Sequence, residues 1–160
     1  MRLPLFCAAL CLATPAVAGD LTVTFRDGAP KDRFTISYDG SCAADAMQVA
    51  IDLGTAPAGL IFDITSAGAG VEVFQPLEWV VGRARTSTVT DGDTVVRLDL
   101  DALAPGAMLA FTVDIDDTTS SRQITVDGSE MAGATLRAVG QEALFDATGT
   151  ARLSLPPCLS

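Results

Sequence analysis

Hydrophobic and polar side chains alternate along many short stretches of this sequence, and this alternation most limits what the chain can fold into. The pattern begins with Leu21, Val23 and Phe25, which are separated by threonines. It recurs in residues 33–38, 47–53, 95–100 and 109–115. A period of two places neighbouring side chains on opposite faces of a β-strand, so one face of each stretch is apolar. No stretch carries an amphipathic helical stripe longer than about two turns.

Turn-forming residues separate these stretches at intervals of about ten residues. Gly, Pro, Asp and Ser supply the breaks, as in Asp27-Gly28-Ala29-Pro30 and Asp39-Gly40-Ser41. About ten short strands with this spacing are typical of antiparallel sheets packed face to face. We therefore predict an all-β fold, an antiparallel two-sheet β-sandwich of immunoglobulin-like or jelly-roll-like type, in which residues 19–160 form a single domain.

The first 18 residues have the pattern of a secretory signal peptide. Arg2 precedes an apolar run from Leu3 to Ala13, and Ala16-Val17-Ala18 forms an A-x-A cleavage site. The run is too short to span a bilayer. We predict cleavage after Ala18 and export to the periplasm or the extracellular space. A lipoprotein signal at Cys7 or Cys11 is the alternative, but neither cysteine follows the leucine and small residues that lipidation requires.

Two cysteines, Cys42 and Cys158, remain after the predicted cleavage. An even pair in an exported chain is typical of a disulfide. The closed loop is long, so the bond would stabilise the fold by roughly 4–5 kcal/mol in the chain-entropy description. Two free thiols are the alternative interpretation.

The charge balance excludes several classes of function. The chain has 20 acidic and 10 basic residues and no histidine. Such an acidic surface argues against binding nucleic acid or anionic membranes and favours a cation or a basic partner. No second apolar run predicts a transmembrane span. The sequence contains no G-x-S-x-G, P-loop or H-E-x-x-H motif, so we do not expect an enzyme, and no cofactor is predicted.

Acidic residues are concentrated in two strings, Asp91-Gly92-Asp93 and Asp114-Ile115-Asp116-Asp117. If residues 95–100 and 109–115 form a hairpin turned by Pro105-Gly106, Asp93 lies opposite Asp116. Both strings then meet at one end of the sandwich. Asp101 would lie at the opposite end.

Clustered carboxylates repel one another unless a hard cation lies between them, and Ca²⁺ accepts flexible shells of oxygen ligands. A calcium site is therefore one interpretation of this pattern, and Glu130 is a candidate addition to it. Its predicted ligands are Asp91, Asp93, Asp114, Asp116 and Asp117. Acidic residues that only cap turns are the alternative, since D-G-D is a common turn string.

Phe74, Pro76 and Trp79 form the only concentration of aromatic residues. A surface patch of this kind stacks on a sugar ring or holds a partner's loop. A single Trp in a small β-domain is more often part of the core, and we predict a core position for Trp79.

Four strings together resemble small exported bacterial proteins described as aggregation factor core proteins, named after the core of the sponge aggregation factor. The strings are residues 59–64 (GLIFDI), 68–74 (GAGVEVF), 110–118 (AFTVDIDDT) and 128–134 (GSEMAGA). The similarity extends over most of residues 20–158. It implies an extracellular adhesion-like module with a protein or glycan partner.

The sequence therefore predicts an exported, non-enzymatic binding or adhesion-like module that is assisted by calcium. Two other classes stay open at this stage. One is an enzyme or enzyme inhibitor of the envelope, which requires a cleft with convergent polar groups. The other is a structural envelope protein that binds no small ligand.

Overall fold

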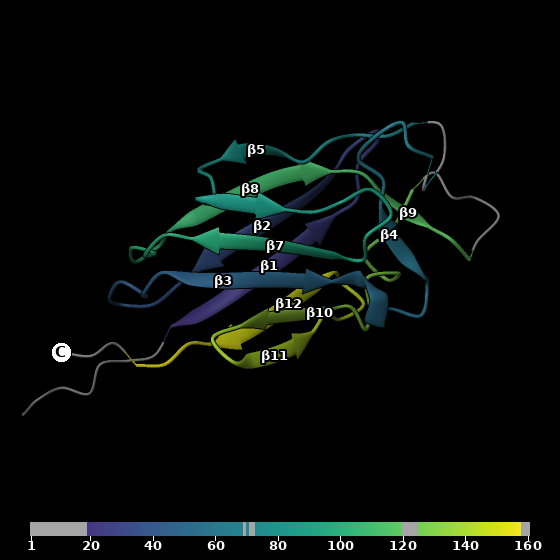
Figure 1. The fold of residues 1–160 in the computed structure, drawn as a ribbon. Helices are drawn as coiled ribbons and strands as arrows, with labels where there is room; N and C mark the ends of the chain where they lie inside the picture. Colours follow the sequence, from purple (N-terminus) through teal and green to yellow (C-terminus); the bar gives the residue numbers. More distant parts are fainter. Residues whose placement is uncertain (1–18, 69, 71–72, 120–124, 158–160) are drawn as a thin grey trace, which may run out of the picture.

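A computed structural model describes residues 19–68, 70, 73–119 and 125–157. Twelve strands and one short 3₁₀-helix occur in these residues (Figure 1). The elements are β1 (Asp20–Arg26), β2 (Asp32–Tyr38), β3 (Met47–Asp52), η1 (Leu53–Thr55), β4 (Leu60–Phe62), β5 (Glu78–Val81), β6 (Thr86–Thr88), β7 (Val95–Leu100), β8 (Met108–Val113), β9 (Ile115–Asp117), β10 (Thr135–Ala138), β11 (Gln141–Leu144) and β12 (Thr150–Ser154).

The strands form two five-stranded antiparallel sheets and one small two-stranded sheet. The first sheet has the order β12-β1-β2-β8-β5, the second has the order β11-β10-β3-β7-β6, and β4 pairs with β9. The two large sheets pack as a β-sandwich, which confirms the predicted fold class. None of the helices in the described residues is long and apolar enough to cross a membrane.

The alternating side chains bury one face of each sheet between the two layers. In β1, Leu21, Val23 and Phe25 are buried, as the periodicity predicts. The ring of Phe34 on β2 stacks on Phe111 of β8, with 5.1 Å between the ring centroids. Burial of large apolar side chains of this kind supplies most of the free energy that stabilises a sandwich.

The predicted hairpin of residues 95–100 and 109–115 is wrong. β7 pairs with β3 and β6 in the second sheet, whereas β8 pairs with β2 and β5 in the first. The turn at Pro105-Gly106 therefore leads the chain from one sheet to the other (Figure 1). Each strand buries one apolar face against the opposite layer, and alternation does not specify which neighbouring strand receives its backbone hydrogen bonds.

Two other expectations have different outcomes. Trp79 lies on β5 and packs against the core, with its ring 5.3 Å from that of Phe111. Trp79 is half-buried and packs against the edge of the core, so the predicted core position is confirmed only in part. Phe74 precedes β5, and 37% of its surface is exposed.

Cys42 lies in the loop between β2 and β3, and its main-chain carbonyl accepts a 2.8 Å hydrogen bond from the Tyr38 hydroxyl. Cys158 lies outside the described residues, so the predicted disulfide stays a prediction.

Candidate functional site

The small sheet of β4 and β9 brings the two acidic strings to one end of the sandwich. Phe62, the last residue of β4, pairs with Ile115 of β9. On its other side, the Phe62 N–H donates to the Asp93 carbonyl, and the Gly92 N–H donates to the Phe62 carbonyl. β4 therefore lies between the 91–93 turn and β9. The sequence correctly indicated that the strings approach each other, but the connecting element is β4 and not a direct hairpin.

Asp63 follows β4 and lies at the centre of this region, although the sequence did not identify it as a site residue. Its main-chain N–H donates to the Asp114 carbonyl over 3.2 Å, and its carbonyl accepts from the Gln75 N–H over 3.2 Å. The Asp114 N–H in turn donates to the Gln75 carbonyl. These three bonds fix the backbone of Asp63 against the chain that leads into β9.

The carboxyl group of Asp63 is fully buried, and neither of its oxygens has a hydrogen-bond partner among the described residues. A Cβ atom on Gly70 would come within 2.6 Å of Asp63 Oδ2 and would also collide with Asp116 Oδ2. Because glycine has no side chain, the Gly70 backbone can pack closely against Oδ2 of Asp63 and Oδ2 of Asp116. A buried carboxyl oxygen without a partner normally costs free energy, so this position favours a protonated or cation-bound Asp63 over a free carboxylate.

Asp91 and Asp116 approach Asp63 from neighbouring elements. Asp91 Oδ1 accepts hydrogen bonds from the Ile64 and Thr65 N–H groups over 2.8 and 2.9 Å. Asp116 lies on β9 and is 3% exposed. Burial, followed by the negative charges of Asp116 and Asp91, raises the pKa of Asp63 to about 6. The Asp63 carboxyl group therefore holds a proton to higher pH than an isolated aspartate does.

Asp114 and Asp32 extend the buried acidic region toward the first sheet. Burial and the charges of Asp116 and Asp63 raise the pKa of Asp114 to about 7. Asp32 begins β2 beside Val113, and burial raises its pKa to about 8, with Asp114 contributing. The sequence did not single out Asp32 or Asp63. The only signal for Asp63 is one acidic residue inside the otherwise apolar run of residues 60–64.

Two of the five predicted ligands, Asp93 and Asp117, have carboxyl groups that accept hydrogen bonds from main-chain N–H groups close to them in the sequence. Asp93 is exposed, and its Oδ2 accepts a hydrogen bond from the Thr90 N–H over 3.0 Å. Asp117 Oδ1 accepts from the Thr119 N–H over 2.9 Å. Glu130 accepts from the Asp127 N–H and so caps its own turn. Asp101 forms an exposed ion pair with Arg85. The contacts of Asp93, Asp117 and Glu130 match the turn-capping alternative.

Within the described ranges, no group of three or more Asp, Glu, Cys or His side chains has the spacing of a formed metal site. The arrangement is instead one buried carboxyl group, Asp63, beside Asp91 and Asp116, with Asp114 behind them. We call Asp63, Asp91 and Asp116 the carboxyl cluster. Such a cluster can share protons, or it can close around a hard cation with additional oxygen ligands from water or main-chain carbonyls.

Comparison with models of known protein families found no match to this chain. Comparison with curated proteins found no match either.

Proposed function

We propose that the protein is an exported, non-enzymatic binding or adhesion-like module in which a calcium ion bound at the carboxyl cluster fixes one end of the sandwich. The observation that carries the proposal is the Asp63 carboxyl group, which is fully buried and has no hydrogen-bond partner among the described residues. A bound cation would satisfy both of its oxygens and would remove the repulsion from Asp91 and Asp116.

The chemistry of the cluster favours calcium over other common metal ions. The chain contains no histidine, and the three carboxyl groups supply oxygen ligands only. Zinc and copper prefer nitrogen and sulfur ligands, whereas Mg²⁺ requires a small and nearly ideal octahedron. Ca²⁺ accepts six to eight oxygens in irregular geometry. It therefore suits carboxylates on three different segments that have to move together on binding.

The adhesion-like role rests on the predicted signal peptide and on the resemblance to aggregation factor core proteins. A cation at this place would link the segment after β4, the 91–93 turn and β9, which are far apart in the sequence. Fixed loops at the end of a sandwich present a rigid surface to a partner, because the partner then does not have to order them.

Thermal unfolding with calcium and with a chelator tests the calcium site. If free Ca²⁺ is about 100 times the Kd, binding stabilises the folded state by about 2.7 kcal/mol, which raises the Tm by roughly 5–10 °C. Asp63→Asn is expected to abolish this rise, and to melt no lower than the native protein in chelator because it removes a buried ionisable group. Asp45→Asn is the control, since Asp45 is exposed.

Two results would overturn the calcium site: no change of Tm in millimolar Ca²⁺, or the same rise in Asp63→Asn as in the native protein. Clustering of protein-coated beads tests the adhesion-like role separately. We expect clustering of native beads with Ca²⁺, and dispersal by chelator or by Asp63→Asn. The proposed role would be contradicted by clustering that persists both in chelator and in Asp63→Asn, or by no clustering at any calcium concentration.

A further inference from the structure

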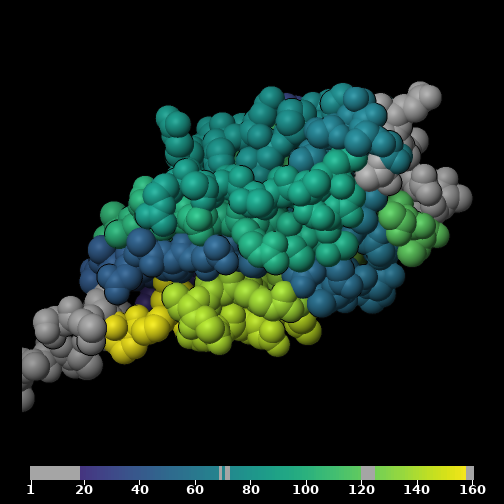
Figure 2. Space-filling view, in the orientation of Figure 1, coloured from purple at the N-terminus to yellow at the C-terminus, as the bar shows by residue number. Residues whose placement is uncertain are grey.

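A groove of about 760 Å³ crosses the outer face of the second sheet. Its floor follows β3, where the small side chains of Ala46 and Ala50 leave space. Figure 2 shows β3 as a blue band between the teal strands around β7 and the yellow-green β10–β11 segment. The groove is separate from the carboxyl cluster, none of whose residues lines it.

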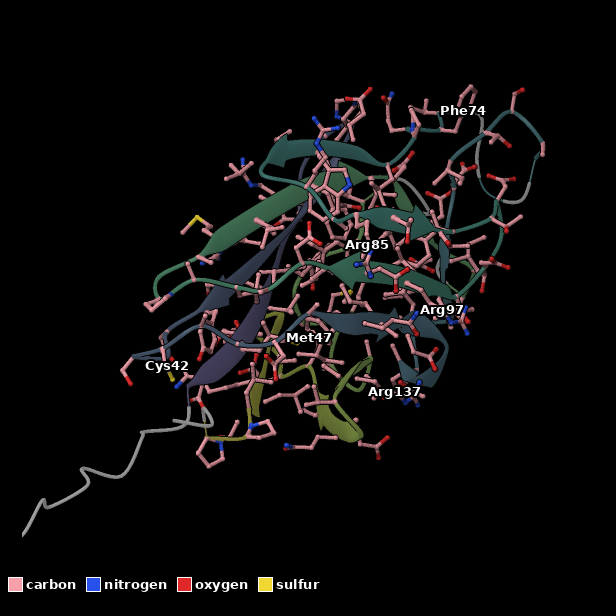
Figure 3. All side chains as sticks on the ribbon, turned by 60° about the vertical axis from the view of Figure 1, so that its left-hand side comes forward. Cys42, Met47, Phe74, Arg85, Arg97 and Arg137 are labelled. Atoms are coloured by element: carbon pink, nitrogen blue, oxygen red, sulfur yellow. The ribbon has the colours of Figure 1, made fainter. Side chains whose placement is uncertain are left out.

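Two arginines flank the centre of this groove. Ala50 on β3 pairs with Arg137 of β10 on one side and with Arg97 of β7 on the other. Directly paired residues point to the same face of a sheet, and adjacent strands lie about 4.8 Å apart. The two arginines therefore rise from the same face, about 10 Å apart at the backbone, with only a methyl group between them. Figure 3 shows both side chains beside β3.

The Arg97 residue is exposed, and its side chain forms no ion pair or hydrogen bond with another described residue. Arg137 is held from one side: its Nη1 lies 2.7 Å from Asp52 Oδ2, and its Nε lies 3.4 Å from Glu142 Oε2. These contacts leave the Nη2 donors of Arg137 for another acceptor. A carboxylate placed above Ala50 would accept from Arg97 and from these donors, and guanidinium groups match the planar geometry of a carboxylate.

The other lining residues restrict the ligand further. Asp52 and Glu142 balance the two arginines, so the groove has no net charge and does not suit a polyanion. Gln48 also lines it, and its amide is positioned through Nε2 by Asp99. Its Oε1 atom, together with Glu142, provides acceptors for ligand hydroxyl groups.

A peptide is a poor candidate for this groove. β10, β3 and β7 each have a hydrogen-bonded neighbour on both sides, so no free strand edge is available to pair with an added strand. The lining also lacks an aromatic residue that would anchor a peptide side chain. Recognition has to use the side chains of Arg, Gln and Glu, which suit a small polar molecule.

We infer that this groove binds a small polyhydroxylated monocarboxylate of the sugar-acid class. The carboxylate lies between Arg97 and Arg137 over Ala50, and the hydroxyl groups bond to Gln48 and Glu142. This inference does not depend on the calcium site, and its test is carried out in chelator. Either the calcium site or the groove ligand can therefore be refuted without affecting the other.

Titration calorimetry with D-glucuronate tests the site, with D-glucose, propionate and sulfate as comparison ligands. We expect saturable glucuronate binding with a Kd on the order of 1 mM, and at least tenfold weaker binding of glucose, propionate and sulfate. Arg97→Gln is expected to weaken glucuronate binding about tenfold. Arg33→Gln is the control, because Arg33 is exposed on β2 in the other sheet.

The inference is overturned by absence of saturable glucuronate binding up to about 10 mM, which is about ten times the expected Kd. Equal binding of propionate would remove the role of the hydroxyl groups, and equal binding of glucose or sulfate would remove the role of the carboxylate. Unchanged affinity in Arg97→Gln, with Arg33→Gln also unchanged, would exclude this groove as the site. The melting temperature of each variant shows whether it is folded.

Discussion

Replacing Asp32 with Asn is expected to stabilise the protein near neutral pH and to reduce the dependence of its stability on pH. Asp32 is 3% exposed, and burial raises the pKa of its carboxyl group from 3.8 to about 8. Its Oδ1 accepts a 3.1 Å hydrogen bond from the Gly28 N–H, which an Asn Oδ1 can also accept. The substitution therefore removes the ionisation while it keeps this contact.

The direction in which stability changes with pH follows from the number of protons bound by the folded and the unfolded protein. Between pH 3.8 and about 8, the folded protein keeps a proton on Asp32 that the unfolded chain has lost. Stability therefore falls as pH rises through this window, by about 1.4 kcal/mol per pH unit. At pH 7 the accumulated loss reaches at most about 4 kcal/mol. The Asn amide places a buried donor where Asp32 also accepts from the main chain of Ile115, which costs about 1–3 kcal/mol, so a net gain of about 1–3 kcal/mol is expected.

Urea unfolding followed by Trp79 fluorescence, in chelator at several pH values between 4.5 and 9, measures the effect. The gain of Asp32→Asn over the native protein should be largest above pH 7 and should vanish near pH 4.5. Asp45→Asn, at an exposed position, should leave the pH dependence unchanged. Parallel pH profiles for Asp32→Asn and the native protein would refute the assignment of a raised pKa to Asp32.

Two further predictions concern a hairpin turn and the N-terminus. Val139 begins the two-residue turn between β10 and β11 with φ of 47°, where β-branched residues are strained and Asn is favoured before Gly. Val139→Asn should stabilise the protein by about 1 kcal/mol in urea unfolding, and equal stabilisation by Val139→Ala would contradict this reason. Expression of the full chain in a bacterium with a secretion pathway should yield a periplasmic or secreted product that starts at Gly19 in its mass spectrum, and an intact cytoplasmic product would contradict the predicted signal peptide.

The sequence predicts the layers of this fold better than the pairing within them. The alternation in β1 and β2 identifies Leu21, Val23, Phe34 and Ile36 as buried, because burial depends only on which face of a strand a residue occupies. Strand pairing depends on contacts between distant segments. β7 and β8 are adjacent in the sequence and clearly patterned, yet they join different sheets.

The candidate site likewise contains some residues that the sequence predicts and one that it does not. Asp91, Asp114 and Asp116 do gather at one end of the sandwich, because β4 lies between their segments. Asp63 was not predicted, since a single acid in a strand pattern is usually a solvated residue. Its burial results from the 91–93 turn, β9 and Gly70 closing around it, and no local pattern of residues 60–64 contains that information.

The pairing of β1 with β12 also limits how the chain can reach this fold. β1 is the first described strand and β12 is the last, and they meet in register from Asp20 opposite Ser154 to Thr24 opposite Thr150. Until residues 150–155 have left the ribosome, one edge of β1 has no partner, and the layer contributed by Ala151, Leu153 and Leu155 is missing. The first sheet of this domain is therefore complete only when residues 150–155 are available, and a chain stalled before residue 150 exposes an edge strand to aggregation.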